Sequence, residues 1–428
     1  MATKRFSTED GFDQALKAYI TQHSAVRPEI EQAVAGIITA VRTRGDAAVL
    51  EYTRQFDHAG ATRDALRVPV EVIDRAYASC PAELRQALER AGQRIEAYHR
   101  RQLPEDVRYT DPDGITLGWQ WRPVDAVGLY VPGGKAVYPS SVLMNAIPAR
   151  IAGVKRIAMV VPAPGGEVNP LVLAAAKIAD IREVYAIGGA QAVAALAIGT
   201  ETIPKVDMIV GPGNAYVAAA KRQLFGEVGI DMVAGPSEIL VIADDSANPG
   251  WLAADLLSQA EHDTDARAIL VTDSEALADQ VIEKVEQSFA LLSRAEMARQ
   301  SWQENGLVVV MPSLEEAAEV ANRLAPEHLE LAVEEPDALL PQLRHAGAIF
   351  LGHHTPEAVG DYTAGPSHVL PTGGSARFSS GLSVYSFLKR SSLIGCSVEG
   401  FAALAEETAA LADAEGLTAH ALSVRIRK

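Results

Sequence analysis

The strongest constraint on the fold is a regular alternation of short apolar runs and helical segments that begins at residue 124. The apolar runs are residues 126–131, 157–161, 184–187, 208–210 and 239–242, and the helical segments between them begin at residue 140 or cover 169–179, 190–198 and 215–225. Strands that are apolar at every position are buried on both faces, which indicates a parallel sheet covered by helices on both sides. The same alternation continues to residue 351 and predicts a second such sheet.

Four glycine-containing loops lie at the ends of these strands, where open parallel sheets bind their ligands. The loops are Pro-Gly-Gly-Lys at 132–135, Gly-Gly-Ala-Gln at 188–191, Gly-Pro-Gly-Asn at 211–214 and Gly-Pro-Ser-Glu at 235–238. Glycine lets a ligand approach the backbone, and a following helix favours a pyrophosphate group. A single loop of this kind is more often a tight turn, but four together predict a binding rim. None has the G-x-G-x-x-G spacing of a conventional dinucleotide fingerprint.

Composition argues against several classes of protein. The chain has 428 residues, 48% of them hydrophobic, and this length suggests two or more domains. The net charge of −17 argues against nucleic acid as a partner, because phosphate binding needs a basic surface. The N-terminus lacks the apolar core of a signal peptide, and the uncharged run at 184–200 is expected to be buried core, not a membrane span. Cys80 and Cys396 provide no disulfide framework, so a cytoplasmic location is expected.

Candidate metal ligands are centred on the end of an amphipathic helix, in the sequence Asp-Leu-Leu-Ser-Gln-Ala-Glu-His-Asp at 255–263. Gln259 and His262 stand three residues apart and share a helix face, so they present an amide oxygen and an imidazole together, which suits zinc. A helix end of this composition is more often simply solvated. Asp361, in an irregular loop, and His420, near the C-terminus, would complete a set of two nitrogens and two oxygens if the segments meet.

Two general bases, Glu327 and His328, stand side by side. A proline ends the preceding helix, which places the pair in a turn where catalytic residues are common, although such a pair is also common on a surface. His368 lies in the same irregular loop as the candidate aspartate. The adjacent His353 and His354 are expected on a solvated loop with no role in chemistry.

Several longer motifs are spread over essentially the whole chain. They are Tyr-Val-Pro-Gly-Gly-Lys at 130–135, Val-Gly-Pro-Gly-Asn-Ala-Tyr-Val at 210–217, Gly-Ile-Asp-Met-Val-Ala-Gly-Pro-Ser-Glu at 229–238, Ser-Gln-Ala-Glu-His-Asp at 258–263, Ala-Pro-Glu-His-Leu-Glu at 325–330, Gly-Asp-Tyr at 360–362 and Glu-Gly-Leu-Thr-Ala-His at 415–420. Together they resemble the signatures of histidinol dehydrogenases, and as a set they are highly specific. The resemblance implies a homodimeric, zinc-requiring enzyme of histidine biosynthesis. It would oxidise L-histidinol to L-histidine in two NAD-dependent steps through an aldehyde that stays bound.

The resemblance also assigns residues by their place in these motifs. The implied zinc ligands are Gln259, His262, Asp361 and His420, and the implied NAD contacts are Tyr130, Gln191 and Asn214. The implied substrate contacts are the four zinc ligands with Ser237, His328, His368 and Glu415. His328 would accept the alcohol proton in the first oxidation, and Glu327 would activate water for the second. No cysteine lies in any motif, so a thiohemiacetal mechanism has no candidate nucleophile.

The family implies an α/β fold with two incomplete Rossmann-like parallel-sheet domains, a helical N-terminal extension and a C-terminal tail that reaches the partner subunit's site. On this basis we expect the extension at 1–25 and a discontinuous α/β domain with the zinc and catalytic residues at 26–125 and 239–377. The NAD-binding domain is expected at 126–238 and the tail at 378–428. An incomplete Rossmann fold would account for the missing G-x-G-x-x-G spacing.

Other functions are distinguished by the residues that they would lack. A related zinc and NAD dehydrogenase for another polar alcohol, such as sulfopropanediol, would have replaced the residues that hold histidinol, whereas Glu327, His328, His368 and Glu415 are all present. A non-catalytic nucleotide-binding protein would have lost ligands or bases, and a zinc hydrolase would not need the four-loop rim. Ser367 departs from the family pattern, which has Asn there, with little expected change in chemistry.

Overall fold

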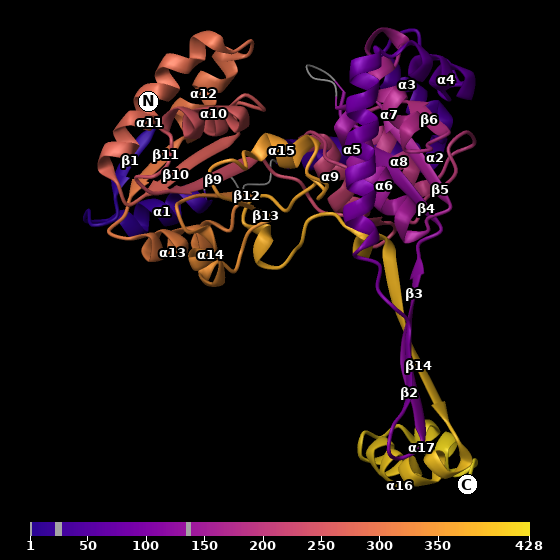
Figure 1. Cartoon of the computed structure of the whole chain (residues 1–428). Coiled ribbons are helices and arrows are strands. Elements are labelled where there is room, and N and C mark those ends of the chain that lie inside the picture. The colour runs from indigo at the N-terminus through magenta and orange to yellow at the C-terminus, as the bar shows by residue number, and fades with distance from the viewer. Residues whose placement is uncertain (1, 22–27, 134–137) are drawn as a thin grey trace.

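The computed structural model describes residues 2–21, 28–133 and 138–428. Figure 1 shows two α/β bodies and a long arm that extends from one of them to a pair of helices at the C-terminus. Each body is built around a parallel sheet, which confirms the fold class predicted from the strand–helix alternation. No helix in the described part of the chain is long and apolar enough to cross a membrane.

The first body contains a five-stranded parallel sheet in the order β6-β5-β4-β7-β8. Its strands are β4 (Ala126–Tyr130), β5 (Arg156–Val161), β6 (Glu183–Ala186), β7 (Met208–Val210) and β8 (Gly229–Ile230). The helical segments between them are α6 (Pro139–Ala152), η1 (Pro164–Gly166), α7 (Pro170–Ile178), α8 (Gly189–Ile198) and α9 (Ala215–Leu224). The strand order reverses between β4 and β7, and sheets of this kind bind ligands at such a switch point.

Four N-terminal helices cover the faces of this sheet: α2 (Pro28–Arg44), α3 (Asp46–Phe56), α4 (Val70–Ser79) and α5 (Ala82–Arg100). Helices α2 and α3 pack with α8 and α9, and α4 and α5 pack with α6 and α7. Val34 and Val41 of α2 are buried in one core, and Ile73 of α4 and Ile95 of α5 are buried in the other. These helices therefore belong with the five-stranded sheet, whereas we expected residues 26–125 to join residues 239–377. The expected boundary between residues 25 and 26 lies outside the described residues.

The second body contains a six-stranded parallel sheet in the order β1-β11-β10-β9-β12-β13. Its strands are β1 (Thr3–Phe6), β9 (Glu238–Ala243), β10 (Arg267–Thr272), β11 (Leu307–Val310), β12 (His328–Ala332) and β13 (Ala348–Leu351). Its helical segments are α1 (Phe12–Thr21), α10 (Pro249–Ala260), α11 (Glu275–Ser288), η2 (Phe289–Leu291), α12 (Ala295–Asn305), α13 (Leu314–Leu324), α14 (Pro336–Leu339), η3 (Leu340–Gln342) and α15 (Glu357–Tyr362). The N-terminal extension thus contributes an edge strand as well as a helix.

The arm is a three-stranded antiparallel sheet in the order β14-β3-β2. It is made of β2 (Val107–Thr110), β3 (Ile115–Pro123) and β14 (Leu388–Cys396), and β14 follows the short turns η4 (Ser375–Arg377) and η5 (Val384–Phe387). Beyond it, α16 (Val398–Ala414) and α17 (Thr418–Arg425) pack together at the far end of the arm (Figure 1). The predicted tail therefore leaves the body along a strand that pairs with β3.

Candidate active site

Most of the predicted catalytic and zinc residues lie near the amino ends of β9 and β12, on the side that contacts the first body. His328 is the first residue of β12, which pairs with β9. The sequence had placed His328 in a turn, but the chain passes from the end of α13 almost directly into the strand. The loop with His368 reaches the first body, because His368 Nε2 lies 3.2 Å from the hydroxyl oxygen of Ser141 on α6.

Both candidate bases are held by a single residue, Glu238, at the start of β9. The backbone N–H of Glu238 donates to Glu327 Oε2 at 2.9 Å, and His328 Nδ1 lies 3.1 Å from the carbonyl oxygen of Glu238. A carbonyl oxygen only accepts, so Nδ1 carries the proton and Nε2 keeps its lone pair. His328 Nε2 is buried and has no hydrogen-bond partner in the described structure. The arrangement leaves one imidazole nitrogen available as a base.

Burial shifts the pKa of both bases. It lowers the pKa of His328 to about 3, with a smaller contribution from the nearby His262 and His368. Burial also raises the pKa of Glu327 well above its usual range, and the carboxylates of Glu238 and Asp361 raise it further. His328 is therefore neutral near pH 7, whereas Glu327 binds its proton more tightly than an exposed glutamate does.

Gln259 has the unsatisfied polar groups expected of a metal ligand. Its side chain is fully buried at the last turn of α10, and neither the amide oxygen nor the amide nitrogen has a hydrogen-bond partner in the described structure. Buried amides are almost always hydrogen-bonded, so this orphan group indicates a missing partner. His262 lies just beyond the helix end, in a turn closed by a bond from its N–H to the carbonyl of Gln259 at 3.1 Å. Burial lowers the pKa of His262, so its ring is neutral and able to bind a metal.

Asp361 joins this group from α15. Its Oδ1 lies 3.8 Å from His328 Nε2, and its backbone carbonyl lies 3.0 Å from His368 Nδ1. His328, Glu357 and Asp361 present ligand atoms that all lie within 4.8 Å of one another, an arrangement that could hold a metal ion. Asp361 thus belongs both to the predicted zinc set and to this cluster, and Glu357 of the cluster lies on the same helix, α15.

Several carboxyl groups lie close to one another and to His328. Glu357 Oε1 lies 3.3 Å from His328 Nδ1, and its pKa is raised well above the usual range by burial and then by neighbouring carboxylates. Burial raises the pKa of Asp361 to about 7 and that of Asp255 to about 6. Burial, and then the charge and hydrogen bond of Asp255, raises the pKa of Glu330 to about 9. Like charges in a low dielectric retain protons unless a cation neutralises them, so the cluster favours a bound cation.

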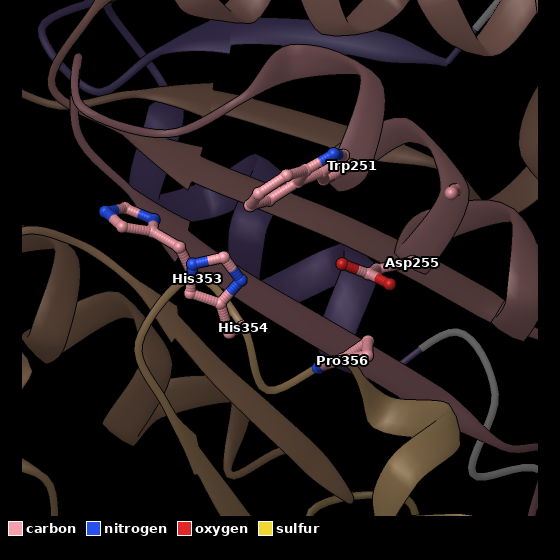
Figure 2. A pocket seen from close by; sticks show the side chains of 6 residues that line it. Trp251, Asp255, His353, His354 and Pro356 are labelled. Atoms are coloured by element: carbon pink, nitrogen blue, oxygen red, sulfur yellow. The ribbon is translucent and has the colours of Figure 1, made fainter.

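A surface pocket beside α10 is separate from the predicted site residues. It is lined by Trp251, Ala254, Asp255, His353, His354 and Pro356 (Figure 2). The rings of Trp251 and His354 are tilted by 52° to each other with centroids 5.2 Å apart, and His353 Nε2 lies 3.0 Å from the hydroxyl oxygen of Ser246. The two histidines are therefore part of a surface contact with neighbouring side chains.

The predicted NAD residues lie at the carboxyl ends of the five-stranded sheet. Tyr130 ends β4, and its buried hydroxyl accepts a hydrogen bond from the N–H of Gly189 at 3.1 Å. Burial raises the pKa of Tyr130 to about 12. Gln191 is buried against Gly189, on the first turn of α8. Asn214 is the N-cap of α9, and Gly134 and Lys135 of the first rim loop lie outside the described residues.

Two predicted residues do not reach this site within the same chain. His420, in α17, and Glu415, at the end of α16, are exposed, and Figure 1 shows these two helices at the far end of the arm, away from α10, which carries Gln259. Ser237, in contrast, directly precedes β9, where its carbonyl oxygen accepts from the N–H of Arg267 at 3.0 Å. The predicted zinc ligands Gln259 and Asp361 therefore lie on α10 and α15, two helices that contact each other, whereas His420 lies on α17.

Sequence reasoning missed two residues of the site. Glu238 ends the 229–238 motif, but it holds the bases through its backbone N–H and carbonyl, which a residue of any type could provide. Glu357 stands four residues before Asp361, so the two share a helix face, and that spacing could have indicated it. Ser367, which departs from the family pattern, is buried with its hydroxyl 3.4 Å from the carbonyl oxygen of Met144.

Comparison with known proteins identifies the family. A sequence profile for histidinol dehydrogenase matches residues 21–428. Histidinol dehydrogenase of Ruegeria pomeroyi is 56% identical over 421 residues, covering 98% of this chain and 97% of that protein. The enzyme of Rhizobium meliloti is 55% identical over 427 residues, covering 100% of this chain and 98% of that protein.

The fold agrees over the same length. A crystal structure of histidinol dehydrogenase from Elizabethkingia anophelis superposes with a TM-score of 0.94 at 37% sequence identity, and the match covers 100% of this chain and 98% of that chain. With the family profile, the curated relatives and the solved structure in agreement, the chain belongs to the histidinol dehydrogenase family.

Proposed function

We propose that this chain oxidises L-histidinol to L-histidine in two NAD-dependent steps, with L-histidinaldehyde held at the site between them. The observation that carries the proposal is the pair of buried bases, Glu327 and His328, fixed on one residue, together with the buried amide of Gln259, which has no partner in the described structure. An alcohol oxidation followed by an aldehyde oxidation needs a proton acceptor for each step, and two differently tuned bases meet this need. The family to which the chain belongs gives the substrate.

The residues present fit a zinc ion. Gln259, His262 and Asp361 offer oxygen and nitrogen donors, the amide of Gln259 is buried without a partner, and the surrounding carboxyl groups favour a cation. We assign these three residues as zinc ligands, with His420 as the fourth. Bound zinc would hold the amine and imidazole of the substrate and so orient its alcohol carbon.

Hydride transfer requires NAD, because zinc has no redox chemistry of its own. Tyr130, Gln191 and Asn214 lie at the carboxyl ends of β4, β6 and β7, beside the switch point of the five-stranded sheet. We assign them as NAD contacts. The six-stranded sheet would then supply the substrate side of the site, with Ser237 and His368 as further substrate contacts between the two bodies.

The two bases divide the proton transfers. His328 would accept the alcohol proton at Nε2 in the first oxidation, since its Nδ1 proton is committed to the carbonyl of Glu238. Glu327 would take a proton from the water that adds to the aldehyde in the second oxidation. Its raised pKa makes it a stronger base than an ordinary carboxylate, which suits abstraction of a proton from water.

A second copy of the chain would complete the site. The α16–α17 pair carries His420 and Glu415 but buries only a small core of Ala409, Ala412 and Ala421. Several large apolar side chains on it are exposed, including Val398, Leu411 and Ile426. So small a core does not stabilise a separate domain, and exposed apolar residues at this density indicate an interface. We infer a homodimer in which the arm carries His420 and Glu415 to the partner's site.

The proposal is tested by the stoichiometry of NADH formation. Purified enzyme with zinc, L-histidinol and excess NAD should form two NADH for each histidine produced. Sulfopropanediol, offered in a parallel assay, should give no comparable turnover, because the residues expected to hold histidinol, among them Glu327, His328 and His368, are all present. A single NADH for each histidinol consumed, or a preference for the other alcohol, would contradict the proposal.

A further inference from the structure

A buried ion pair lies beneath the rim loop that carries Asn214. Lys221 of α9 and Asp231, just after β8, form a salt bridge in which the side chains are 2% and 1% exposed. Lys221 Nζ also donates to the carbonyl oxygen of Gly211 at 3.0 Å, and Asp231 Oδ2 accepts from the N–H of Gly211 at 2.8 Å. The pair therefore holds the backbone of Gly211 at its N–H and at its carbonyl.

Gly211 is a position where the backbone must be fixed. Its φ is +104°, a conformation that favours glycine, and an added Cβ would lie 2.1 Å from the carbonyl oxygen of Tyr130. The 211–214 loop therefore lies directly against the end of β4. Any shift of Gly211 would move the loop relative to Tyr130, and these are two parts of the proposed NAD site.

Asn214, at the end of the same loop, is oriented by its helix. Its side-chain oxygen accepts from the N–H groups of Tyr216 at 3.0 Å and Val217 at 3.2 Å, as the N-cap of α9. The oxygen is thus engaged by the helix, and the amide N–H groups are the donors left for a ligand. Lys221 lies on this same helix, so one end of the loop is fixed by the cap and the other by the ion pair.

A buried ion pair is costly, and apolar residues of similar volume often stabilise a fold as well or better. We propose that Lys221 and Asp231 are positioning residues for NAD, which hold the 211–214 loop at the distance from Tyr130 that the dinucleotide requires. This inference rests on the proposed NAD site. The pair also fixes the start of the segment that leads to Ser237, because Asp231 Oδ1 accepts from the N–H of Met232 at 2.6 Å.

The test replaces both members of the pair, because removing one would leave a buried charge without a partner and destabilise the fold. The variant is Lys221→Met with Asp231→Asn, and a milder variant is Lys221→Gln with Asp231→Asn. Equilibrium titration with NAD, KM for NAD, KM for histidinol, kcat and zinc content are measured on the zinc-loaded protein. We expect NAD binding to weaken roughly tenfold, the factor that corresponds to about 1.4 kcal/mol. Zinc content and kcat at saturating NAD should stay near the wild-type values.

The matched control is the pair Arg156–Glu183, at the amino ends of β5 and β6 in the same sheet. Its side chains are 28% and 17% exposed, and the same exchange is Arg156→Met with Glu183→Gln. This control should lower the melting temperature without weakening NAD binding. A purely structural role for Lys221 and Asp231 would make the two double variants alike, with lower stability and unchanged NAD affinity.

The experiment distinguishes a failure of the proposed function from a failure of the proposed positioning role. If the wild-type enzyme forms no NADH from histidinol, the proposed function itself fails. If it does form NADH, and the Lys221 and Asp231 variants bind NAD as the wild type does, only the positioning role is overturned. Should the methionine variant not fold, the glutamine variant decides by the same titration, because glutamine cannot form the ion pair.

Discussion

The Nδ1 atom of His328 lies 3.1 Å from the carbonyl oxygen of Glu238, and this contact selects the tautomer of the imidazole. The N–H of the same Glu238 donates to Glu327. The spacing between the two bases is therefore set by a backbone unit in a central strand, which is more rigid than a loop. Substitutions at either base should change the chemistry without changing the position of the other.

The two bases should separate the two half-reactions. Glu327→Gln keeps an oxygen that can accept from the N–H of Glu238, so it removes the base with little change in structure. We expect it chiefly to slow aldehyde oxidation, by ~10²–10⁴-fold, the usual cost of a lost general base. His328→Ala should slow the alcohol step as well. Single-turnover NADH formation from histidinol and, separately, from histidinaldehyde measures both, and equal slowing of the two steps by Glu327→Gln would show that these roles are wrong.

Loss of a zinc ligand should remove the metal and leave the fold intact. His262→Ala changes a residue just beyond the end of α10, outside the buried strands, so the melting temperature of the zinc-free protein should change little. Zinc retained per subunit after gel filtration should fall to near zero, together with activity. His354→Ala, in the surface pocket of Figure 2, is the control and should keep its zinc. Full zinc occupancy in the His262 variant would remove this residue from the ligand set.

Two substitutions of Asn214 distinguish its cap from its ligand role. Asn214→Asp keeps a side-chain oxygen for the N–H groups of α9 but loses the amide donor. Asn214→Ala loses both, and should in addition cost about 1 kcal/mol of stability for the missing cap. We expect both variants to weaken NAD binding with unchanged zinc content. If the aspartate variant binds NAD normally, the amide makes no contact with the dinucleotide.

The acidic cluster should make the zinc-free protein less stable as the pH rises. The folded-state pKa of Glu330 is about 9, above its usual value of 4.5, so folding favours the protonated form. The stabilisation is complete at low pH and is lost between about pH 5 and pH 9, at no more than about 1.4 kcal/mol per pH unit. Glu330→Gln should flatten this dependence in thermal melts without zinc. If the melting temperatures of the variant and the wild type changed equally with pH, Glu330 would not be the source of the pH dependence.

The cysteines should be dispensable for turnover. Cys80 is buried at the end of α4 and Cys396 is exposed at the end of β14, and both are free thiols. Neither lies on β9, β12 or α15, the elements that carry the bases and their contacts. The double variant Cys80→Ser with Cys396→Ser should therefore keep kcat within a small factor of the wild type. A large loss of kcat in a folded double variant would revive a thiol mechanism.

Much of the fold follows from local sequence patterns. The runs at 126–131, 157–161 and 239–242 are apolar at nearly every position and alternate with helical segments, which is the pattern of strands buried on both faces of a parallel sheet. Local patterns do not predict which of the two sheets a given helix covers. An apolar stripe such as that of α2 shows that a helix is buried against something, but it does not show which sheet lies opposite, and here the assignment of residues 26–125 failed.

The site was predictable to the extent that its residues act through their side chains. Gln259, His262 and Asp361 could be proposed as ligands because each carries a donor atom that its residue type reveals, and the buried amide of Gln259 without a partner supports that proposal. The role of Glu238 escaped notice because any residue could offer the same N–H and carbonyl. The place of His420 depends on the resemblance, which implies a C-terminal tail that reaches the partner subunit's site, because motif order along a chain carries no information about which copy of the chain a residue serves.

The arm has a consequence for genetics. If each site takes His420 from the other subunit, two inactive proteins can restore one another. A dimer that joins a His262→Ala subunit to a His420→Ala subunit contains one site with both defects and one with neither. Mixed after dissociation, or expressed from two defective alleles in one cell, such subunits would regain activity that neither possesses alone.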